Sequence, residues 1–120
     1  MTNKKILIVD DDSTNRRLVK ILLSKKPNIE VIEADNGLDA LNKLTNDISL
    51  ILLDIYMPVM DGIKFLQNLR TEKPELINTP VIVLSTDDTK KQEALSWGAV
   101  DFIVKPVNPV NLWEKVSKYL

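Results

Sequence analysis

Three consecutive aspartates, Asp10, Asp11 and Asp12, follow directly on a short apolar run. A fourth, Asp54, directly follows a second apolar run. Neighbouring carboxylates repel one another, so a chain keeps them charged only where they are solvated, cap a helix or share a cation. Because the chain has no histidine and no cysteine, the available ligands are oxygens. Such a set suits a hard cation such as Mg2+, which takes one or two carboxylates and keeps several waters.

The metal ligands expected on this basis are Asp11 and Asp54, with Asp10 acting through a bound water. The backbone carbonyl of Tyr56 is close enough in sequence to complete the set. A carboxylate beside a metal can also act as a nucleophile, and aspartyl phosphate is a known covalent intermediate of that kind. Asp54 is therefore the candidate nucleophile.

Two further groups suit phosphoryl transfer, which depends on positioning and on neutralising the phosphoryl oxygens. Lys105 follows another apolar run and could supply positive charge. Ser85, with Thr86 beside it, ends yet another run and could donate a hydrogen bond to a phosphoryl oxygen. The loop from Ile55 to Gly62 would shape the backbone beside the nucleophile.

Each of these residues also has a purely structural interpretation. The aspartate run, with Ser13, and the pair Ser85 and Thr86 could cap helices. Asp54 could be a turn residue, and Lys105 a solvated lysine next to a strand end. These alternatives do not explain why four separate strands should end in complementary charge. The joint pattern favours a site.

The elements that must position these groups alternate along the chain. Four runs are apolar at every position, as in strands covered on both faces: Ile6 to Val9, Leu50 to Leu53, Val81 to Leu84 and Phe102 to Val104. A fifth, Ile29 to Ala34, carries two glutamates and suits a sheet edge. Helical spacing of apolar residues follows each run: Leu18, Val19, Leu22 and Leu23; Leu38, Leu41 and Leu44; Ile63, Leu66 and Leu69; Ala94 and Leu95; Leu112, Trp113, Val116, Tyr119 and Leu120.

Five alternations of strand and helix predict a doubly wound α/β domain with a parallel sheet and helices on both faces. Ligands of such sheets bind at the carboxyl ends of the strands. The expected caps agree with these elements: Asp12 or Ser13 begins the first helix, the turn at Asp35 to Gly37 leads into the second, and Pro109 opens the last.

Composition excludes several classes of protein. The 120 residues fit one domain, 1–120, and its apolar runs are too short to span a membrane. A net charge of −1 and dispersed basic residues give little attraction to nucleic acid, so no direct nucleic acid binding is expected. The three glycines form no dinucleotide or P-loop motif. With no secretory signal, we expect a soluble, cytoplasmic protein.

Four segments in order, VDDDSTNRRLV, LLDIYMPVMDG, VIVLST and GAVDFIVKPV, closely resemble the receiver domain of two-component response regulators. The resemblance extends from Ile6 to the last helix. It implies a flavodoxin-like fold with strand order 2-1-3-4-5 and five helices. It also implies Mg2+ binding by Asp10 and Asp11, a phosphoacceptor at Asp54, and a cis bond between Lys105 and Pro106.

In the family, the conserved lysine corresponds to Lys105, the switch hydroxyl to Ser85 and the switch aromatic to Phe102. The implied function is a signalling switch rather than an enzyme. It takes a phosphoryl group from a phosphohistidine of a sensor histidine kinase or histidine phosphotransfer protein. Ser85 then moves and Phe102 turns inward, which changes the face of helix 4, strand 5 and helix 5 for an effector or a homodimer.

Two functions of other classes remain. A phosphohydrolase would use the same nucleophile, but such enzymes usually carry a second acid two residues later, where this chain has Tyr56. A docking module without chemistry would not need the complete set of acids, hydroxyl and lysine. The sequence does not identify the kinase, the pathway, the output or the oligomeric state.

Overall fold

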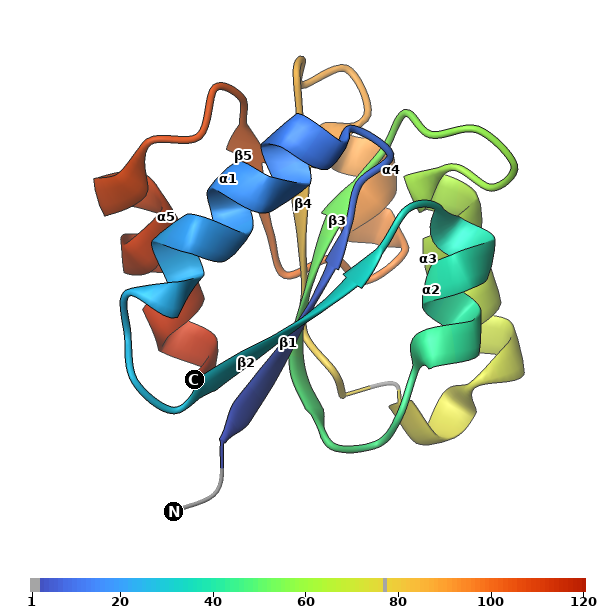
Figure 1. The fold of residues 1–120 in the computed structure, drawn as a ribbon. Helices are drawn as coiled ribbons and strands as arrows, with labels where there is room; N and C mark the ends of the chain where they lie inside the picture. Colours follow the sequence, from blue (N-terminus) through green and yellow to red (C-terminus); the bar gives the residue numbers. More distant parts are fainter. Residues whose placement is uncertain (1–2, 77) are drawn as a thin grey trace.

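The computed structural model describes residues 3–76 and 78–120. They form a five-stranded parallel sheet in the order β2-β1-β3-β4-β5, with helices on both faces (Figure 1). This confirms the predicted fold class and strand order. The strands are β1 (Lys4–Val9), β2 (Ile29–Ala34), β3 (Ile48–Asp54), β4 (Val81–Ser85) and β5 (Asp101–Val104). The helices are α1 (Ser13–Ser24), α2 (Gly37–Lys43), α3 (Gly62–Glu72), α4 (Lys91–Ser96) and α5 (Pro109–Val116), with short 3-10 turns at Pro74–Leu76 and Ser117–Tyr119.

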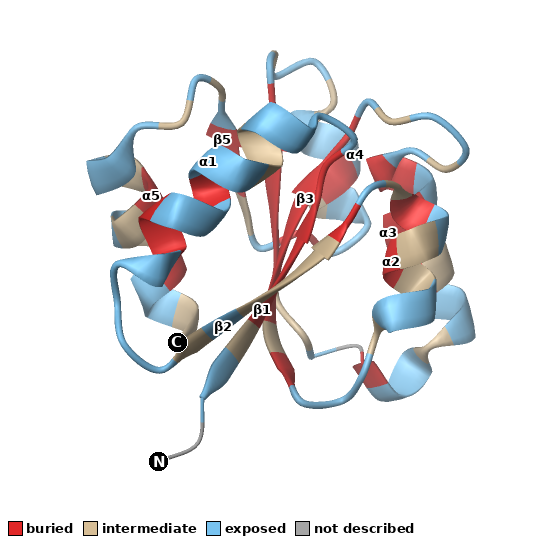
Figure 2. Cartoon of the chain, in the orientation of Figure 1, coloured by how far each residue is buried: buried red, intermediate tan, exposed pale blue. Residues whose placement is uncertain are grey.

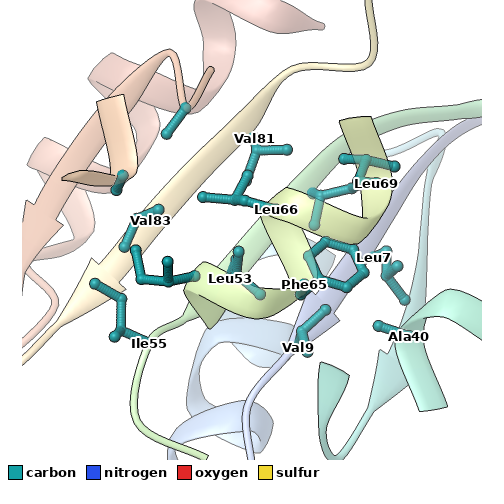
Figure 3. Close-up of a cluster of buried hydrophobic side chains, with 14 of the residues drawn as sticks. Leu7, Val9, Ala40, Leu53, Ile55, Phe65, Leu66, Leu69, Val81 and Val83 are labelled. Carbon is teal, nitrogen blue, oxygen red and sulfur yellow. The ribbon is translucent and has the colours of Figure 1, made fainter. Parts of the chain in front are cut away.

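The side chains of the strands alternate between two apolar clusters, one on each face of the sheet. In β1, Ile6 and Ile8 pack with α1 and α5, whereas Leu7 and Val9 pack on the side of α2, α3 and α4. This alternation follows from the two-residue period of a strand. Figure 3 shows the second cluster, in which Phe65 of α3 is fully buried. Figure 2 shows buried strands beneath helices with exposed outer surfaces.

The helix starts follow the expected capping residues. Asp12 caps α1, because its side chain accepts hydrogen bonds from the backbone N–H groups of Thr14 and Asn15. Asn36 caps α2 in the same manner, and Pro109 is the first residue of α5. The alternative of Asp12 or Ser13 is thereby decided for Asp12.

Some expectations about burial are wrong. Val104 was expected to be covered on both sides but is 49% exposed, because β5 is an edge strand and this residue ends it. Leu18 and Leu38 were expected on apolar helix faces but are also largely exposed. Leu18 lies at the margin of the stripe formed by Val19, Leu22 and Leu23, where helical spacing alone does not decide burial. The edge position predicted for Ile29 to Ala34 is confirmed.

Within the described ranges, no helix combines the length and the apolar character needed to cross a bilayer.

Candidate functional site

The parallel strands bring the predicted site residues to one edge of the sheet. Val9 pairs with Leu53, which places Asp10 and Asp54 after neighbouring strand positions. Further along the sheet, Asp54 pairs with Leu84, and Ser85 pairs with Val104. The carboxyl ends of β1, β3, β4 and β5 therefore meet, as the fold class predicts.

The carboxylates of Asp10, Asp11 and Asp54 converge, with one oxygen from each lying within 4.8 Å of the others. Asp10 and Asp54 are buried, at 3% and 8% exposure, while Asp11 is exposed. Three oxygen donors at such separations, one of them open to solvent, suit a hard cation that keeps part of its water shell. The residues present thus fit a Mg2+ ion.

Both carboxylate oxygens of Asp10 are engaged within the protein. Oδ1 accepts a hydrogen bond of 2.9 Å from the backbone N–H of Asp12, and Oδ2 accepts one of 3.1 Å from Nζ of Lys105. The carbonyl oxygen of Asp10 accepts a 2.6 Å hydrogen bond from Nη1 of Arg16, a residue that the sequence interpretation missed. The sequence could have indicated Arg16, because it lies in the first turns of α1 and these turns follow closely on the end of β1.

Lys105 lies between two of the acids and is not a solvated surface lysine. Its side chain is 10% exposed, and Nζ lies 3.1 Å from Oδ2 of Asp10 and 3.5 Å from Oδ2 of Asp54. Its backbone N–H donates to the carbonyl of Ser85, and the bond to Pro106 is cis, as the resemblance implied. The ammonium therefore neutralises part of the charge that the buried carboxylates accumulate.

Asp54 ends β3, and its environment shifts its acidity. The pKa of Asp54 is raised from 3.8 to about 6, and burial of the carboxylate is the largest cause. Asp10 also raises the pKa, while Lys105 and the backbone N–H of Ile55 lower it. The carboxylate is consequently ionised for the most part at pH 7 but remains poorly solvated. A buried, charged oxygen with few compensating partners has the character of a nucleophile.

The start of α3 packs directly against the backbone of Asp54. A Cβ atom at Gly62 would lie 2.3 Å from the Asp54 carbonyl oxygen, so only glycine permits this approach. Asp61 caps the helix by accepting a hydrogen bond from the backbone N–H of Lys64. Asp54 is thus supported by the start of α3 as well as by its own strand.

Ser85 and Phe102 lie close to this edge but inside the molecule. The Ser85 side chain is fully buried, and Oγ accepts a long hydrogen bond of 3.5 Å from the backbone N–H of Asp87. Because α4 begins only at Lys91, Ser85 does not cap it. Phe102 is 7% exposed and packs in the core, so the inward position expected after phosphorylation is already filled in this structure.

Tyr56 lies at the rim of the site. Its side chain is 47% exposed, and its hydroxyl lies 3.4 Å from that of Thr89 in the loop before α4. The position of its backbone carbonyl among metal ligands stays a prediction.

Comparison with known proteins identifies the family. The family model described as "Response regulator receiver domain" matches residues 6–117. Chemotaxis protein CheY-3 of Vibrio cholerae is 42% identical over 119 residues, which cover 97% of this chain and 91% of that protein. A protein-glutamate methylesterase/protein-glutamine glutaminase of Halalkalibacterium halodurans is 41% identical, covering 97% of this chain but only 34% of its own length. The chain thus spans about a third of one relative and nearly the whole of the other.

A solved structure agrees with these matches. The response regulator protein TrrA of Thermotoga maritima, in complex with Mg(2+)-BeF, is 34% identical, with a TM-score of 0.85 and coverage of 98% of this chain and 99% of that one. Sequence, fold and the acidic edge all lead to one assignment: the chain belongs to the receiver domain family of two-component response regulators, with relatives of the chemotaxis type.

Proposed function

We propose that this receiver domain is a phosphorylation switch in which Asp54 accepts a phosphoryl group from a phosphohistidine. The observation that carries the proposal is the buried carboxylate of Asp54, which lies between the ammonium of Lys105 and two further acids. This arrangement leaves a poorly solvated oxygen beside groups that can neutralise incoming phosphoryl oxygens.

In the proposed reaction, a carboxylate oxygen of Asp54 attacks the phosphorus of the donor. The new oxygen–phosphorus bond forms as the nitrogen–phosphorus bond of the phosphohistidine breaks, and the leaving imidazole takes a proton from solvent. The ammonium of Lys105 now contacts the carboxylates of Asp10 and Asp54. It is close enough to form an ion pair with a phosphoryl oxygen on Asp54 instead. The hydroxyl group of Ser85, whose oxygen now accepts a hydrogen bond from the backbone N–H of Asp87, donates a hydrogen bond to another phosphoryl oxygen.

A Mg2+ ion, when bound, would supply positive charge that offsets the charge on the phosphoryl oxygens. Asp11 and Asp54 are the proposed direct ligands, together with the backbone carbonyl of Tyr56. Asp10 is the proposed ligand through water, because both of its oxygens already accept hydrogen bonds from protein groups. The structure of TrrA from Thermotoga maritima in complex with Mg(2+)-BeF supports a divalent ion in this family.

The proposed output is a change in the face made by α4, β5 and α5. Val104, which ends β5 in this face, is 49% exposed. Phe102 is already inside, so phosphorylation stabilises this inward position and the matching loop before α4, rather than creating space for it. The proposed partners are a sensor histidine kinase or histidine phosphotransfer protein on the input side. An effector or a second copy binds on the output side, in the cytoplasm.

A phosphohydrolase remains the second candidate, because it would share the nucleophile. Such an enzyme needs a further acid two residues after Asp54, and Tyr56 occupies that position with a phenol that points to Thr89. A docking module without phosphoryl chemistry is the third, and it would have no need of a buried ion pair between Lys105 and Asp10. Neither class accounts for the site as well as a switch does.

One assay separates these functions. The chain is incubated with acetyl phosphate and Mg2+, and its intact mass is recorded over time. A switch gains one phosphoryl group that is lost in Asp54→Ala and retained in Asp88→Ala, an exposed aspartate in the loop before α4. Continuous release of inorganic phosphate without an adduct would identify a hydrolase. An unchanged mass without phosphate release would leave the docking module.

A further inference from the structure

Arg16 joins the end of β1 to β2 from its place in α1. Nη1 donates to the carbonyl oxygen of Asp10 at 2.6 Å, and Nε donates to a carboxylate oxygen of Glu33 at 3.0 Å. The Arg16 side chain is only 17% exposed, so these charged hydrogen bonds are partly shielded from water. Because the guanidinium is rigid and planar, its two donors of fixed direction meet one acceptor directly after β1 and another in β2.

With the contact to Arg16, every polar group of Asp10 has a hydrogen-bond partner within the protein. The backbone N–H of Asp10 donates to the carbonyl of Ala34 at the end of β2, at 3.1 Å. Its carbonyl accepts from Arg16, and its carboxylate oxygens accept from Asp12 and Lys105. The backbone N–H and the backbone carbonyl of Asp10 are therefore both tied to β2, the first directly through Ala34 and the second through Arg16 and Glu33.

Glu33 in turn fixes the orientation of the guanidinium. Burial raises the pKa of Glu33, but hydrogen bonds from Arg16 and Lys20 outweigh it and leave the pKa below its ordinary value. Glu33 therefore stays ionised at neutral pH, and its pairing with Arg16 persists. Its backbone carbonyl also accepts a 2.6 Å hydrogen bond from Nζ of Lys43.

The charge of Arg16 by itself would act against a metal in the acidic cluster. A cation next to Asp10 repels a second cation by Coulomb's law. Any benefit of Arg16 to metal binding must therefore come from the way it positions Asp10. Removing the charge of Arg16 should strengthen Mg2+ binding, whereas losing the positioning should weaken it.

We propose that Arg16 is a positioning residue for metal binding: by tying the backbone carbonyl of Asp10 to Glu33 of β2, it fixes the acidic cluster in the arrangement that Mg2+ requires. This inference rests on the proposed function, since it takes Asp10, Asp11 and Asp54 as the Mg2+ site. Groups that orient metal ligands typically change affinity by about 10- to 100-fold when they are replaced.

Isothermal titration calorimetry with Mg2+ alone tests the inference on Arg16→Lys and Arg16→Gln. Lysine keeps the charge but not the two directed donors, so we expect about 10-fold weaker binding. Glutamine removes the charge, and we expect weaker binding here too, although charge alone would make binding tighter. The losses should persist at high salt, where the through-space effect of a charge is screened.

Arg17→Lys and Arg17→Gln are the matched controls, because Arg17 is the exposed neighbour of equal charge on the same helix. Circular dichroism without Mg2+ establishes that each variant is folded at the titration temperature, and either Arg16 variant suffices for the test. Wild-type affinity in Arg16→Lys, or tighter binding in Arg16→Gln, overturns the positioning role. Absence of Mg2+ binding by the wild-type chain would instead overturn the metal site of the proposed function.

Discussion

At the scale of single residues, the decisive feature is a carboxylate held in a poorly solvating place. Asp54 is 8% exposed and lies 3.5 Å from an ammonium, yet its pKa is raised to about 6. Burial exceeds the effect of Lys105, partly because Lys105 is shared with Asp10 at the shorter distance of 3.1 Å. The folded chain therefore holds a charged group at a cost in stability, as functional sites often do.

The cost should be visible in the pH dependence of unfolding. The ordinary pKa of 3.8 applies to the unfolded chain, so the folded chain binds the Asp54 proton more tightly. Its stabilising contribution is present below about pH 4 and is lost as the pH rises toward 6. Asp54→Asn, which resembles the protonated form, should therefore be more stable than wild type at pH 7, by on the order of 2 kcal/mol.

Urea unfolding between pH 4 and pH 8 in EDTA measures this difference, which should shrink toward zero at the acidic end. The exposed Asp88, changed to asparagine, is the control and should show no comparable dependence on pH. A difference for Asp54→Asn that stays constant across the pH range would contradict the assigned cause.

At the scale of elements, the loop between β3 and α3 determines how Asp54 is presented. The loop connects the end of β3 at Asp54 to the start of α3 at Gly62, and Gly62 packs against the carbonyl oxygen of Asp54. Within this loop Val59 adopts a φ of 69°, although its side chain is 77% exposed and branched at Cβ. Side chains of this type rarely occupy the left-handed region, so the loop is locally strained.

Replacing Val59 with glycine should relieve the strain. We expect Val59→Gly to raise the free energy of unfolding by about 1 kcal/mol, because the relief exceeds the entropy that glycine adds to the unfolded chain. Asn28→Gly is a matched control: Asn28 has a φ of 66°, but asparagine tolerates this region well. Its substitution should change stability little. Equal effects in the two variants, measured by urea unfolding, would contradict the strain at Val59.

At the scale of the whole molecule, the site exists because four strands end at one edge of a single sheet. Folding brings three carboxylates within 4.8 Å, and Lys105 supplies only one positive charge to offset them. A divalent cation that binds this cluster binds the folded chain and not the unfolded one. Such a ligand raises stability by mass action.

Mg2+ at concentrations about 100 times its Kd should therefore stabilise the fold by about 2.7 kcal/mol and raise the Tm by roughly 10 °C. NaCl of equal ionic strength is the reference, because screening alone also relieves repulsion. Asp11→Asn should lose most of the shift, whereas Asp88→Asn should keep it. A Tm that responds equally to Mg2+ and to NaCl would count against the metal site.

The sequence by itself determined the α/β class, the strands and the edge at which Asp10, Asp54, Ser85 and Lys105 meet. These follow from local patterns, since apolar runs and helical spacing repeat within a few residues and parallel strands bring their ends together. It also reduced the cap of α1 to Asp12 or Ser13, and the hydrogen bonds to Asp12 decided between them.

Only the tertiary structure decided what each group contacts. The raised pKa of Asp54, the sharing of Lys105 between two acids and the exposure of Val104 all depend on neighbours remote in sequence. The bridge from Glu33 through Arg16 to Asp10 is of the same kind. Solvation and directed hydrogen bonds depend on which atoms lie close together in space. The spacing of apolar residues along the chain, which predicts the helices and strands, does not determine these contacts.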